Sequence, residues 1–270
     1  MKRAILMSVT GLAAAFAVLA AGYLATDPQR AIADEAPKAA ASAGALDRKE
    51  VEMIVRDYLL KNPEIMLEVQ QALEAKQKEE QRVANLEVIE SAKDEIFNAA
   101  YDGLVGNPDG KTTIVEFYDY NCGFCKRAIT DMHELTAADP NLRFVLKEFP
   151  ILGPDSQKAH TVSQAFHRLM PDKYAEFHDQ LLGGHGRATE ESAIKLAVSL
   201  GADEAKLREE MKNPEIQDVF AHSYELAGKL EITGTPSYVV GNEVIFGALG
   251  KDVLSEKIAE ARNCIASAAC

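Results

Sequence analysis

The sequence predicts an α/β protein that carries an inserted helical domain and is preceded by a helical stalk. Two strand patterns, at residues 112–118 and 142–149, flank a helical pattern and form a strand-helix-strand unit. Residues 155–230 then show only helical spacing, and strand patterns return after residue 231. The length of 270 residues and the apolar fraction of 47% allow one large domain or two small ones with a real core.

The first 33 residues read as an export signal. Met1-Lys2-Arg3 is followed by an uncharged, mostly apolar stretch through Thr26, and Ala31-Ile32-Ala33 has the small-x-small form that signal peptidase accepts. We expect cleavage after Ala33. The alternative is an uncleaved membrane anchor, since the stretch is long enough to span a bilayer. In both cases the rest of the chain faces the cell envelope, and the expected location is the periplasm.

A flexible linker and then a stalk are expected next. Residues 34–46 are rich in Ala and Ser and lack apolar periodicity, whereas residues 47–82 are predicted to form a helical oligomerisation stalk and spacer. Asn62 and Pro63 are expected to cap and restart the helix. Each of the two helical segments has one apolar face, formed by Val51, Ile54, Val55, Tyr58 and Leu59 and by Ile65, Met66, Val69 and Leu73.

These apolar faces are too small to enclose a core, so they must pack on something else. We expect a homo-oligomer that forms through residues 47–73. Residues 74–82 are polar on every side, which predicts a spacer that is either solvent-bridging or not firmly helical. In the alternative arrangement the stalk folds back on the body and the protein is monomeric.

The body is divided by the insert. Residues 83–154 are assigned to the first part of the α/β fold, residues 155–230 to the inserted helical domain and residues 231–270 to the second part. The second part contains a hairpin signal at Gly241-Asn242 and a final helix from about Lys251.

The chemistry is expected at Cys122-Gly123-Phe124-Cys125. Cys122 lies directly after a strand and at the start of a helix, where unpaired backbone N–H groups and the helix dipole stabilise a thiolate. The positive charges of Lys126 and Arg127 follow one turn later. We therefore expect a lowered pKa at Cys122, attack of its thiolate on a disulfide, and release of the mixed disulfide by Cys125.

Other interpretations of the cysteine pair remain open. Half of a zinc site would need two further ligands at similar spacing, and the second pair, Cys264 and Cys270, does not have that spacing. An inert structural disulfide is a further alternative, and two thiolates at Cys122 and Cys125 would also suit Cu(I). Cys264 and Cys270 are expected to close a frayed tail by a disulfide, with free or metal-binding thiols as the alternative.

Thr235-Pro236 lies between the helical insert and the hairpin. An X-Pro bond in a tight turn before a strand is a candidate cis peptide, because cis bonds are almost confined to proline.

Together these motifs resemble the DsbA-like branch of the thioredoxin superfamily, over residues 103–254. The resemblance implies a thioredoxin fold in which Thr235 and Pro236 form the cis-proline loop beside the cysteines and hold the substrate backbone. It also implies that Glu116, six residues before Cys122, is a buried carboxylate that helps to move the proton of Cys125. The alternative for Glu116 is a solvent-facing strand residue.

The details favour an isomerase. The dipeptide Gly123-Phe124 is similar to the Gly-Tyr of periplasmic disulfide isomerases, and the layout is similar to the suppressor-of-copper-sensitivity (ScsC) proteins, in which an N-terminal helical region trimerises. This implies a homotrimer, misoxidised envelope proteins as substrates, an ScsB-like membrane thiol reductase as electron donor, no cofactor and a link to copper tolerance. A monomeric dithiol oxidase and a copper-binding thiol module remain as alternatives. The net charge of −13, without a basic cluster, argues against nucleic-acid binding.

Overall fold

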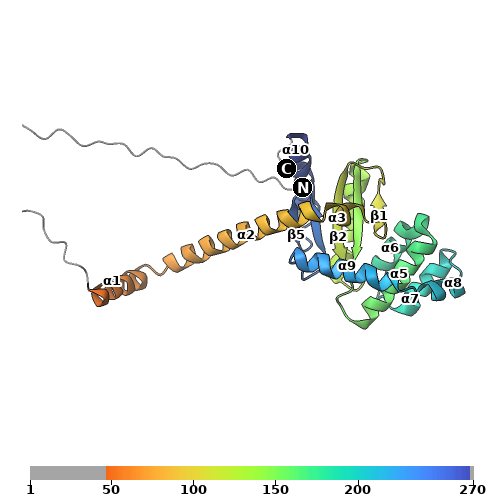
Figure 1. Ribbon diagram of the computed structural model, residues 1–270, viewed down its shortest axis with the longest axis horizontal. Coiled ribbons are helices and arrows are strands. Elements are labelled where there is room, and N and C mark those ends of the chain that lie inside the picture. The colour runs from red at the N-terminus through yellow and green to blue at the C-terminus, as the bar shows by residue number, and fades with distance from the viewer. Residues whose placement is uncertain (1–46, 268–270) are drawn as a thin grey trace, which may run out of the picture. The chain divides into compact units, whose positions relative to one another are not determined.

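The computed structural model describes residues 47–267 (Figure 1). The predicted signal peptide (1–33), the predicted linker (34–46) and Cys270 lie outside the described residues. The chain divides into two units between Lys61 and Asn62. Within residues 47–267 no helix combines the length and the apolar character that crossing a membrane would require.

A five-stranded mixed sheet, in the order β1-β3-β2-β4-β5, forms the centre of the second unit. The central strands β2 and β3 are parallel, and the other three pairings are antiparallel. The helix α4 (Gly123–Ala138) connects β2 to β3, so the strand-helix-strand prediction is confirmed. The strands are β1 (Gly103–Gly106), β2 (Thr112–Tyr118), β3 (Leu142–Glu148), β4 (Ser237–Val240) and β5 (Glu243–Phe246).

Helices cover both faces of this sheet, because alternate residues of each central strand point to opposite sides. Ile114 and Phe144 belong to the core under α4 and α10 (Lys251–Ser267). Val115 and Val145 belong to a second core, which is completed by residues of α2 (Ile65–Ser91), α3 (Lys93–Asn98) and α9 (Glu215–Lys229). The fold is therefore the predicted thioredoxin type, a sheet between two helical layers.

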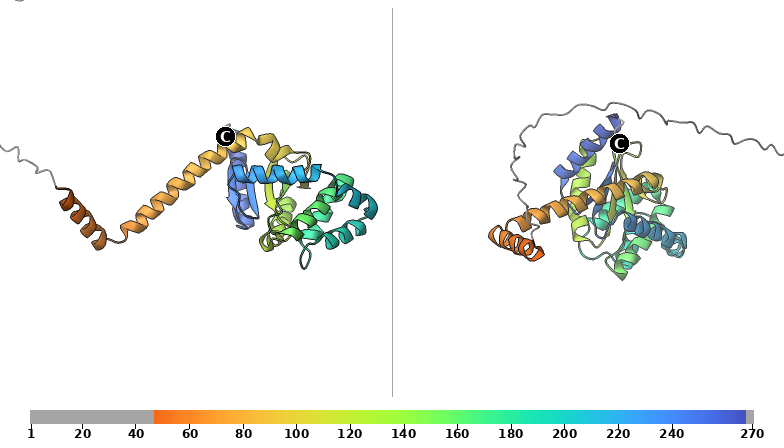
Figure 2. Two further views of the ribbon diagram at one scale, coloured as in Figure 1. Left: turned by 60° about the horizontal axis from the view of Figure 1, so that its bottom comes forward. Right: turned by 60° about the vertical axis from the view of Figure 1, so that its left-hand side comes forward.

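The insert contains only helices and connecting turns between residues 154 and 229, all of which are described. Figure 2 shows the helices between residues 154 and 210 gathered at one end of the sheet, whereas the last helix of the insert, over residues 215–229, runs back along it. The phenol of Tyr174 enters the core there and donates to Glu148 at the end of β3, at 3.1 Å. The helical segments are α5 (Pro154–Leu169), the 3-10 turn Pro171–Lys173, α6 (Tyr174–Leu182), α7 (Glu190–Ser199), α8 (Glu204–Glu210) and α9 (Glu215–Lys229).

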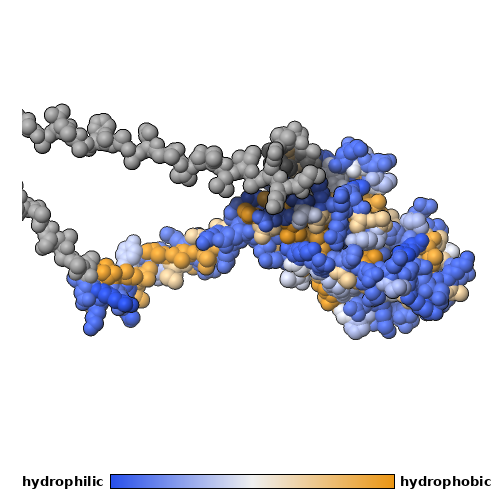
Figure 3. All heavy atoms as spheres, in the orientation of Figure 1, coloured by the Kyte–Doolittle hydropathy of each residue, from blue (hydrophilic) through white to orange (hydrophobic). Residues whose placement is uncertain are grey.

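The segment before the sheet is more regular than its composition indicates. In the first unit, α1 (Arg48–Lys61) buries none of its residues. In the second unit, α2 (Ile65–Ser91) continues without a break through residues 74–82, which are helical and, apart from the half-buried Gln81, exposed. The short helix α3 (Lys93–Asn98) follows it. Figure 3 shows apolar side chains on the surface of α1 and of the first turns of α2.

Two details of the sequence prediction are wrong. The second helix starts at Ile65 with Glu64 at its N-cap, because Asn62 and Pro63 form a turn in which the N–H of Ile65 bonds to the carbonyl of Asn62 at 3.2 Å. The edge strand β1 was not expected either. It is four residues long and begins and ends with glycine, so it lacks the β-branched run that marks a strand.

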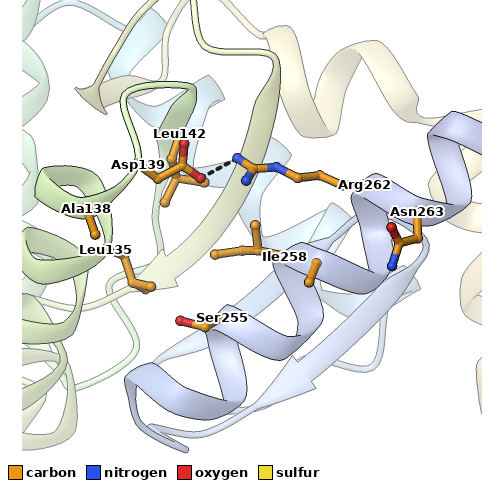
Figure 4. A pocket seen from close by; sticks show the side chains of 9 residues that line it. Leu135, Ala138, Asp139, Leu142, Ser255, Ile258, Arg262 and Asn263 are labelled. Atoms are coloured by element: carbon orange, nitrogen blue, oxygen red, sulfur yellow. Dashed lines mark hydrogen bonds and ion pairs between the residues drawn. The ribbon is translucent and has the colours of Figure 1, made fainter.

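On the face of the sheet that carries Ile114 and Phe144, α10 packs on α4 (Figure 4). Ile258 of α10 lies near Leu135 of α4, and Arg262 forms an ion pair with Asp139 at the end of α4. A shallow pocket lies between the two helices, and its lining does not include Cys122 or Cys125.

Candidate active site

The turn after β2 places Cys122 at the start of α4. Cys122 is the N-cap residue of this helix, and its carbonyl accepts the N–H of Lys126 at 3.0 Å. Both Cys122 and Cys125 are free thiols. Cys122 keeps 6% of its surface exposed and Cys125 keeps none, so Cys122 is the sulfur that another molecule can reach.

The pKa of Cys122 is lowered to about 5, chiefly because the thiol of Cys125 donates a hydrogen bond to it. Burial acts against this, but the side chain of Thr235 and the backbone N–H groups of Cys125 and Phe124 add to the lowering. The protonated thiol can also donate to the carbonyl oxygen of Thr235, at 3.1 Å, which favours the neutral form. The donors to sulfur outnumber this single acceptor, so the thiolate is favoured at neutral pH.

The expected contribution of Lys126 and Arg127 is not borne out by their contacts. The ammonium of Lys126 donates to the carbonyls of Gly184 and Gly186, at 3.0 and 2.8 Å. The guanidinium of Arg127 lies 4.3 Å from the centre of the Phe124 ring. Hydrogen bonds at the helix N-terminus, rather than these two cations, are therefore the main source of the lowered pKa.

Cys125 has the opposite environment. Burial raises its pKa far above the ordinary value, and the hydrogen bond that it gives to Cys122 and the charge of Glu116 raise it further. Cys125 therefore stays protonated while Cys122 is a thiolate. A group that accepts its proton is needed before Cys125 can attack.

Glu116 lies in β2 and is only 2% exposed, so the alternative of a solvent-facing residue is wrong. Its Oε1 atom has no hydrogen-bond partner among the described residues. Burial raises its pKa to about 8, and the charges of Cys122 and Asp131 raise it as well. A carboxyl group with such a pKa exchanges a proton near neutral pH.

The cis-proline prediction is confirmed. The Thr235-Pro236 peptide bond is cis, and the loop that contains it leads into β4. The carbonyl of Pro236 accepts the N–H of Gly247 after β5, at 2.9 Å. The hairpin thus holds Thr235 against Cys122, although 113 residues separate them in sequence.

Sequence reasoning missed the groups that hold the turn before Cys122. Asp119 accepts the hydroxyl of Ser156 at 2.8 Å and the N–H of Leu152 at 2.9 Å. The N–H of Tyr120 bonds to Nε2 of His160 at 3.2 Å, and Nδ1 of His160 lies 2.8 Å from Glu148. The only signal in the sequence is that Asp119 and Tyr120 lie three and two residues before Cys122.

Other reactive groups do not join this site. Residues 47–264 contain no group of three His, Cys, Asp or Glu side chains placed to hold a metal ion. Cys264 is disulfide-bonded, and α10 continues three residues beyond it, to Ser267. Its predicted partner, Cys270, lies outside the described residues.

The site can carry out thiol-disulfide exchange. It combines a reachable thiolate at Cys122, a second thiol at Cys125, a buried carboxyl group at Glu116 and a backbone carbonyl at Thr235 that lies beside the reactive sulfur. These are the parts that nucleophilic attack on a disulfide and resolution of the mixed disulfide require.

Two family models match the chain. Residues 113–259 match the DsbA-like thioredoxin domain, and residues 47–80 match the N-terminal domain of the copper resistance protein ScsC. The first match covers the sheet from β2 onward, Cys122 and Cys125, and the insert.

Solved structures agree with these matches. A thioredoxin-like oxidoreductase from Silicibacter pomeroyi DSS-3 is 39% identical, with a TM-score of 0.60 over 63% of this chain and 97% of its own. A linker-deletion mutant of Proteus mirabilis ScsC is 26% identical, with a TM-score of 0.62 over 83% of this chain and 99% of its own. The second likeness extends further along the chain.

Among curated proteins, disulfide bond formation protein D of Bacillus subtilis is 26% identical over 165 residues, 57% of this chain and 74% of that protein. Over 164 residues, 59% of its length, the chain is also 26% identical to the Na(+)/H(+) antiporter NhaA 1 of Salinispora arenicola. The chain spans only 24% of the length of that antiporter.

Proposed function

This chain belongs to the DsbA-like thioredoxin domain family, and we propose that it is a periplasmic thiol-disulfide oxidoreductase that acts as a disulfide isomerase or reductase. The single observation that supports this most is the contrast between the two cysteines. Cys122 is reachable and has a pKa lowered to about 5, whereas Cys125 is fully buried with a raised pKa. The sulfur that can attack is also the sulfur that a client can reach.

The proposed reaction begins at Cys122. Its thiolate attacks one sulfur of a client disulfide, the client S–S bond breaks, and the other client sulfur leaves as a thiolate. In isomerisation that thiolate attacks another client disulfide, and a later client thiolate displaces Cys122. No net electrons are transferred in this route.

Reduction uses the second cysteine. Cys125 loses its proton to the Glu116 carboxylate and attacks the sulfur of Cys122, so that a Cys122–Cys125 disulfide forms and the client leaves as a dithiol. The two electrons that the client gains come from these two thiols. An ScsB-like membrane thiol reductase would restore them. Thr235 and Pro236 would hold the client backbone beside Cys122, as the carbonyl of Thr235 lies 3.1 Å from the sulfur.

The stalk supports the isomerase over an oxidase. The apolar side chains of α1 and of the start of α2 are exposed within their own units, for example Ile54 at 54% and Val69 at 54%. We propose that residues 47–73 trimerise and that residues 74–82 act as the spacer. Several thiolates that face one client raise the effective concentration of the attacking group.

Activity assays separate isomerase from oxidase. Reduced protein is expected to reactivate scrambled ribonuclease, and Cys122→Ala is expected to abolish this. If the reduced protein fails in that assay while the oxidised protein rapidly oxidises reduced ribonuclease, the function is that of a dithiol oxidase. If Cys122→Ala leaves both activities intact, the thiol mechanism is wrong.

A mass measurement tests the stalk. The full chain is expected to be a trimer in solution, and deletion of residues 34–82 is expected to give a monomer. A monomer in both cases would contradict trimerisation through residues 47–73, without bearing on the chemistry of Cys122.

A copper-related role is a second proposal. The match of residues 47–80 to a copper resistance protein domain and the two free thiols favour it. Two thiolates suit Cu(I). If Cys122 and Cys125 hold this ion, the reduced protein will bind one Cu(I) in competition with a chromogenic chelator, and Cys122→Ala will not. Equal binding by both proteins would exclude the site.

A further inference from the structure

The loop of residues 183–188, which joins α6 to α7 in the insert, is held against the start of α4 by two side chains that flank Cys122. Asn121 directly precedes Cys122, and Lys126 follows it by one turn of the helix. Both side chains therefore start close to Cys122, and both form hydrogen bonds with the backbone of residues 183–188.

Asn121 uses both ends of its amide on the insert. Its Oδ1 accepts the N–H of Ala188 at 2.7 Å, and its Nδ2 donates to the carbonyl of Ala188 at 3.0 Å and to the hydroxyl of Ser156 at 3.0 Å. The side chain therefore pairs with Ala188 much as a neighbouring strand would. The backbone N–H of Asn121 is bound by Asp119 at 2.8 Å, which fixes the base of the side chain.

Lys126 holds the other half of the loop. Its ammonium donates to the carbonyls of Gly184 and Gly186, at 3.0 and 2.8 Å. Gly183, His185, Gly186 and Arg187 are exposed, whereas Ala188 is buried. Gly183, His185 and Gly186 thus face solvent, while the side chains of Asn121 and Lys126 hold the loop through its backbone.

The groups that lower the pKa of Cys122 are different ones. They are the thiol and N–H of Cys125, the N–H of Phe124 and Thr235, all within α4 or the cis-proline loop. The insert supplies none of these four groups. The reactivity of the sulfur and the placement of the neighbouring loop therefore depend on separate sets of contacts.

We propose that Asn121 and Lys126 are positioning residues that fix residues 183–188 as a rim beside Cys122, and that this rim selects protein clients over small disulfides. The proposal rests on the proposed thiol-disulfide function. A client is a large molecule that must lie over the surface next to the sulfur, so a fixed rim adds to its contact area. A small disulfide needs to contact only the sulfur itself. Its rate constant should therefore change little when the loop becomes mobile.

The test uses the full-length reduced protein and the variants Asn121→Ala and Lys126→Gln. Two rate constants are measured for each, with scrambled ribonuclease as the client and with hydroxyethyl disulfide as the small probe. Asn98→Ala is the matched control, since it also removes a bonded amide, but one that accepts from Arg143 at 2.9 Å rather than from the insert.

Both variants are expected to lower the ratio of the client rate constant to the small-disulfide rate constant by about tenfold, the factor that one or two lost hydrogen bonds give. Asn98→Ala is expected to leave the ratio unchanged. Because both side chains hold one loop, the double variant is expected to lower the ratio little further than either single variant. A ratio that stays at the wild-type value, or falls equally in Asn98→Ala, would overturn the proposal.

Amide hydrogen exchange separates this proposal from the proposed function. The N–H of Ala188 is expected to exchange about tenfold faster in Asn121→Ala, because its acceptor is gone. Faster exchange with an unchanged ratio would show that the loop is released but selects nothing. If the wild-type protein reacts with neither disulfide, the proposed function fails, and the selectivity proposal falls with it even where exchange at Ala188 is faster.

Discussion

At the scale of single residues, the site contains two ionisable groups whose pKa values are shifted in opposite directions. Cys122 has a pKa lowered to about 5, and Glu116 has a pKa raised to about 8. The thiolate form of Cys122 is stabilised by hydrogen bonds from α4 and Thr235, whereas the charged form of Glu116 is penalised by its burial. Each group therefore links the stability of the reduced protein to pH.

We expect Cys122→Ala to change this linkage. The pKa of Cys122 falls from its ordinary value of 9.0 to about 5 on folding, so between these values the unfolded chain binds more protons and the thiolate increasingly stabilises the folded state as pH rises. The difference in free energy of unfolding between wild type and Cys122→Ala should grow from pH 5 to pH 9, by at most about 1.4 kcal/mol per pH unit. Denaturant titrations under reducing conditions measure it. A difference independent of pH would contradict the lowered pKa.

Glu116→Gln tests the second group. Because its pKa of about 8 lies above the ordinary 4.5, the folded wild type keeps an extra proton between these values, and Glu116 makes the protein less stable as pH rises through this range. This loss of stability with rising pH should be absent in Glu116→Gln.

The same variant should also affect kinetics. Resolution of a mixed disulfide at Cys122 should be slowed by roughly a hundredfold or more in Glu116→Gln, since Cys125 then lacks a proton acceptor. In wild type this step should speed up between pH 7 and pH 9, as Glu116 ionises, and the variant should lack this rise. Release of a labelled peptide from the mixed disulfide measures the rate. Equal rates in both proteins would remove Glu116 from the mechanism.

At the scale of elements, the edge strand β1 depends on the absence of a side chain at Gly103. A Cβ atom added there would lie 1.8 Å from Cε1 of Tyr174, which is buried and donates to Glu148. We expect Gly103→Ala to lower the free energy of unfolding by at least about 2 kcal/mol, because the ring and its hydrogen bond must move.

Gly228→Ala is the matched control for this effect. Gly228 lies in the last turn of α9, and a Cβ atom there would meet nothing within 4 Å. This variant should stabilise the protein by about 0.5–1 kcal/mol, as alanine favours a helix. Thermal unfolding of both variants measures these opposite effects on stability. Equal effects would mean that packing against Tyr174 does not hold β1.

Most of the helices and strands could be predicted from local patterns in the sequence. The β-branched run of β2, the hairpin glycine at Gly241 and the cysteines at the start of α4 have signals within a few residues, and the structure has the corresponding strand, turn and helix where these signals predict them. The contacts of Asn121 with Ala188 and of Asp119 with Ser156 have no local signal, because each joins segments 67 or 37 residues apart. The clash that forbids a side chain at Gly103 is likewise a property of packing and not of the strand sequence.

At the scale of the whole molecule, the chain combines a polar, acidic body with exposed apolar helices. A face that carries Ile54, Val55 and Tyr58 in solvent is unusual for a monomer, since exposed apolar residues at helical spacing generally mark an interface. The charge of −13 keeps such bodies apart unless a specific contact joins them. The apolar faces of the proposed stalk would supply that contact.

We expect Ile54→Glu to dissociate the proposed trimer. A carboxylate in an apolar interface carries a large desolvation penalty, so light scattering should report a monomer at concentrations where wild type is a trimer. The reaction with hydroxyethyl disulfide should persist, while reactivation of scrambled ribonuclease should fall several-fold. Glu52→Gln is the control on the same helix. Retention of the wild-type mass in Ile54→Glu would contradict an interface through α1.

The most direct measurement is the ultraviolet titration of the reduced protein, in which thiolate absorbance near 240 nm is followed against pH with Cys122→Ala as the blank. A single inflection near pH 5 that Cys122→Ala lacks is the predicted result. An inflection above pH 8, or one that persists in Cys122→Ala, would show that Cys122 is not the ionised nucleophile and would contradict the proposed chemistry.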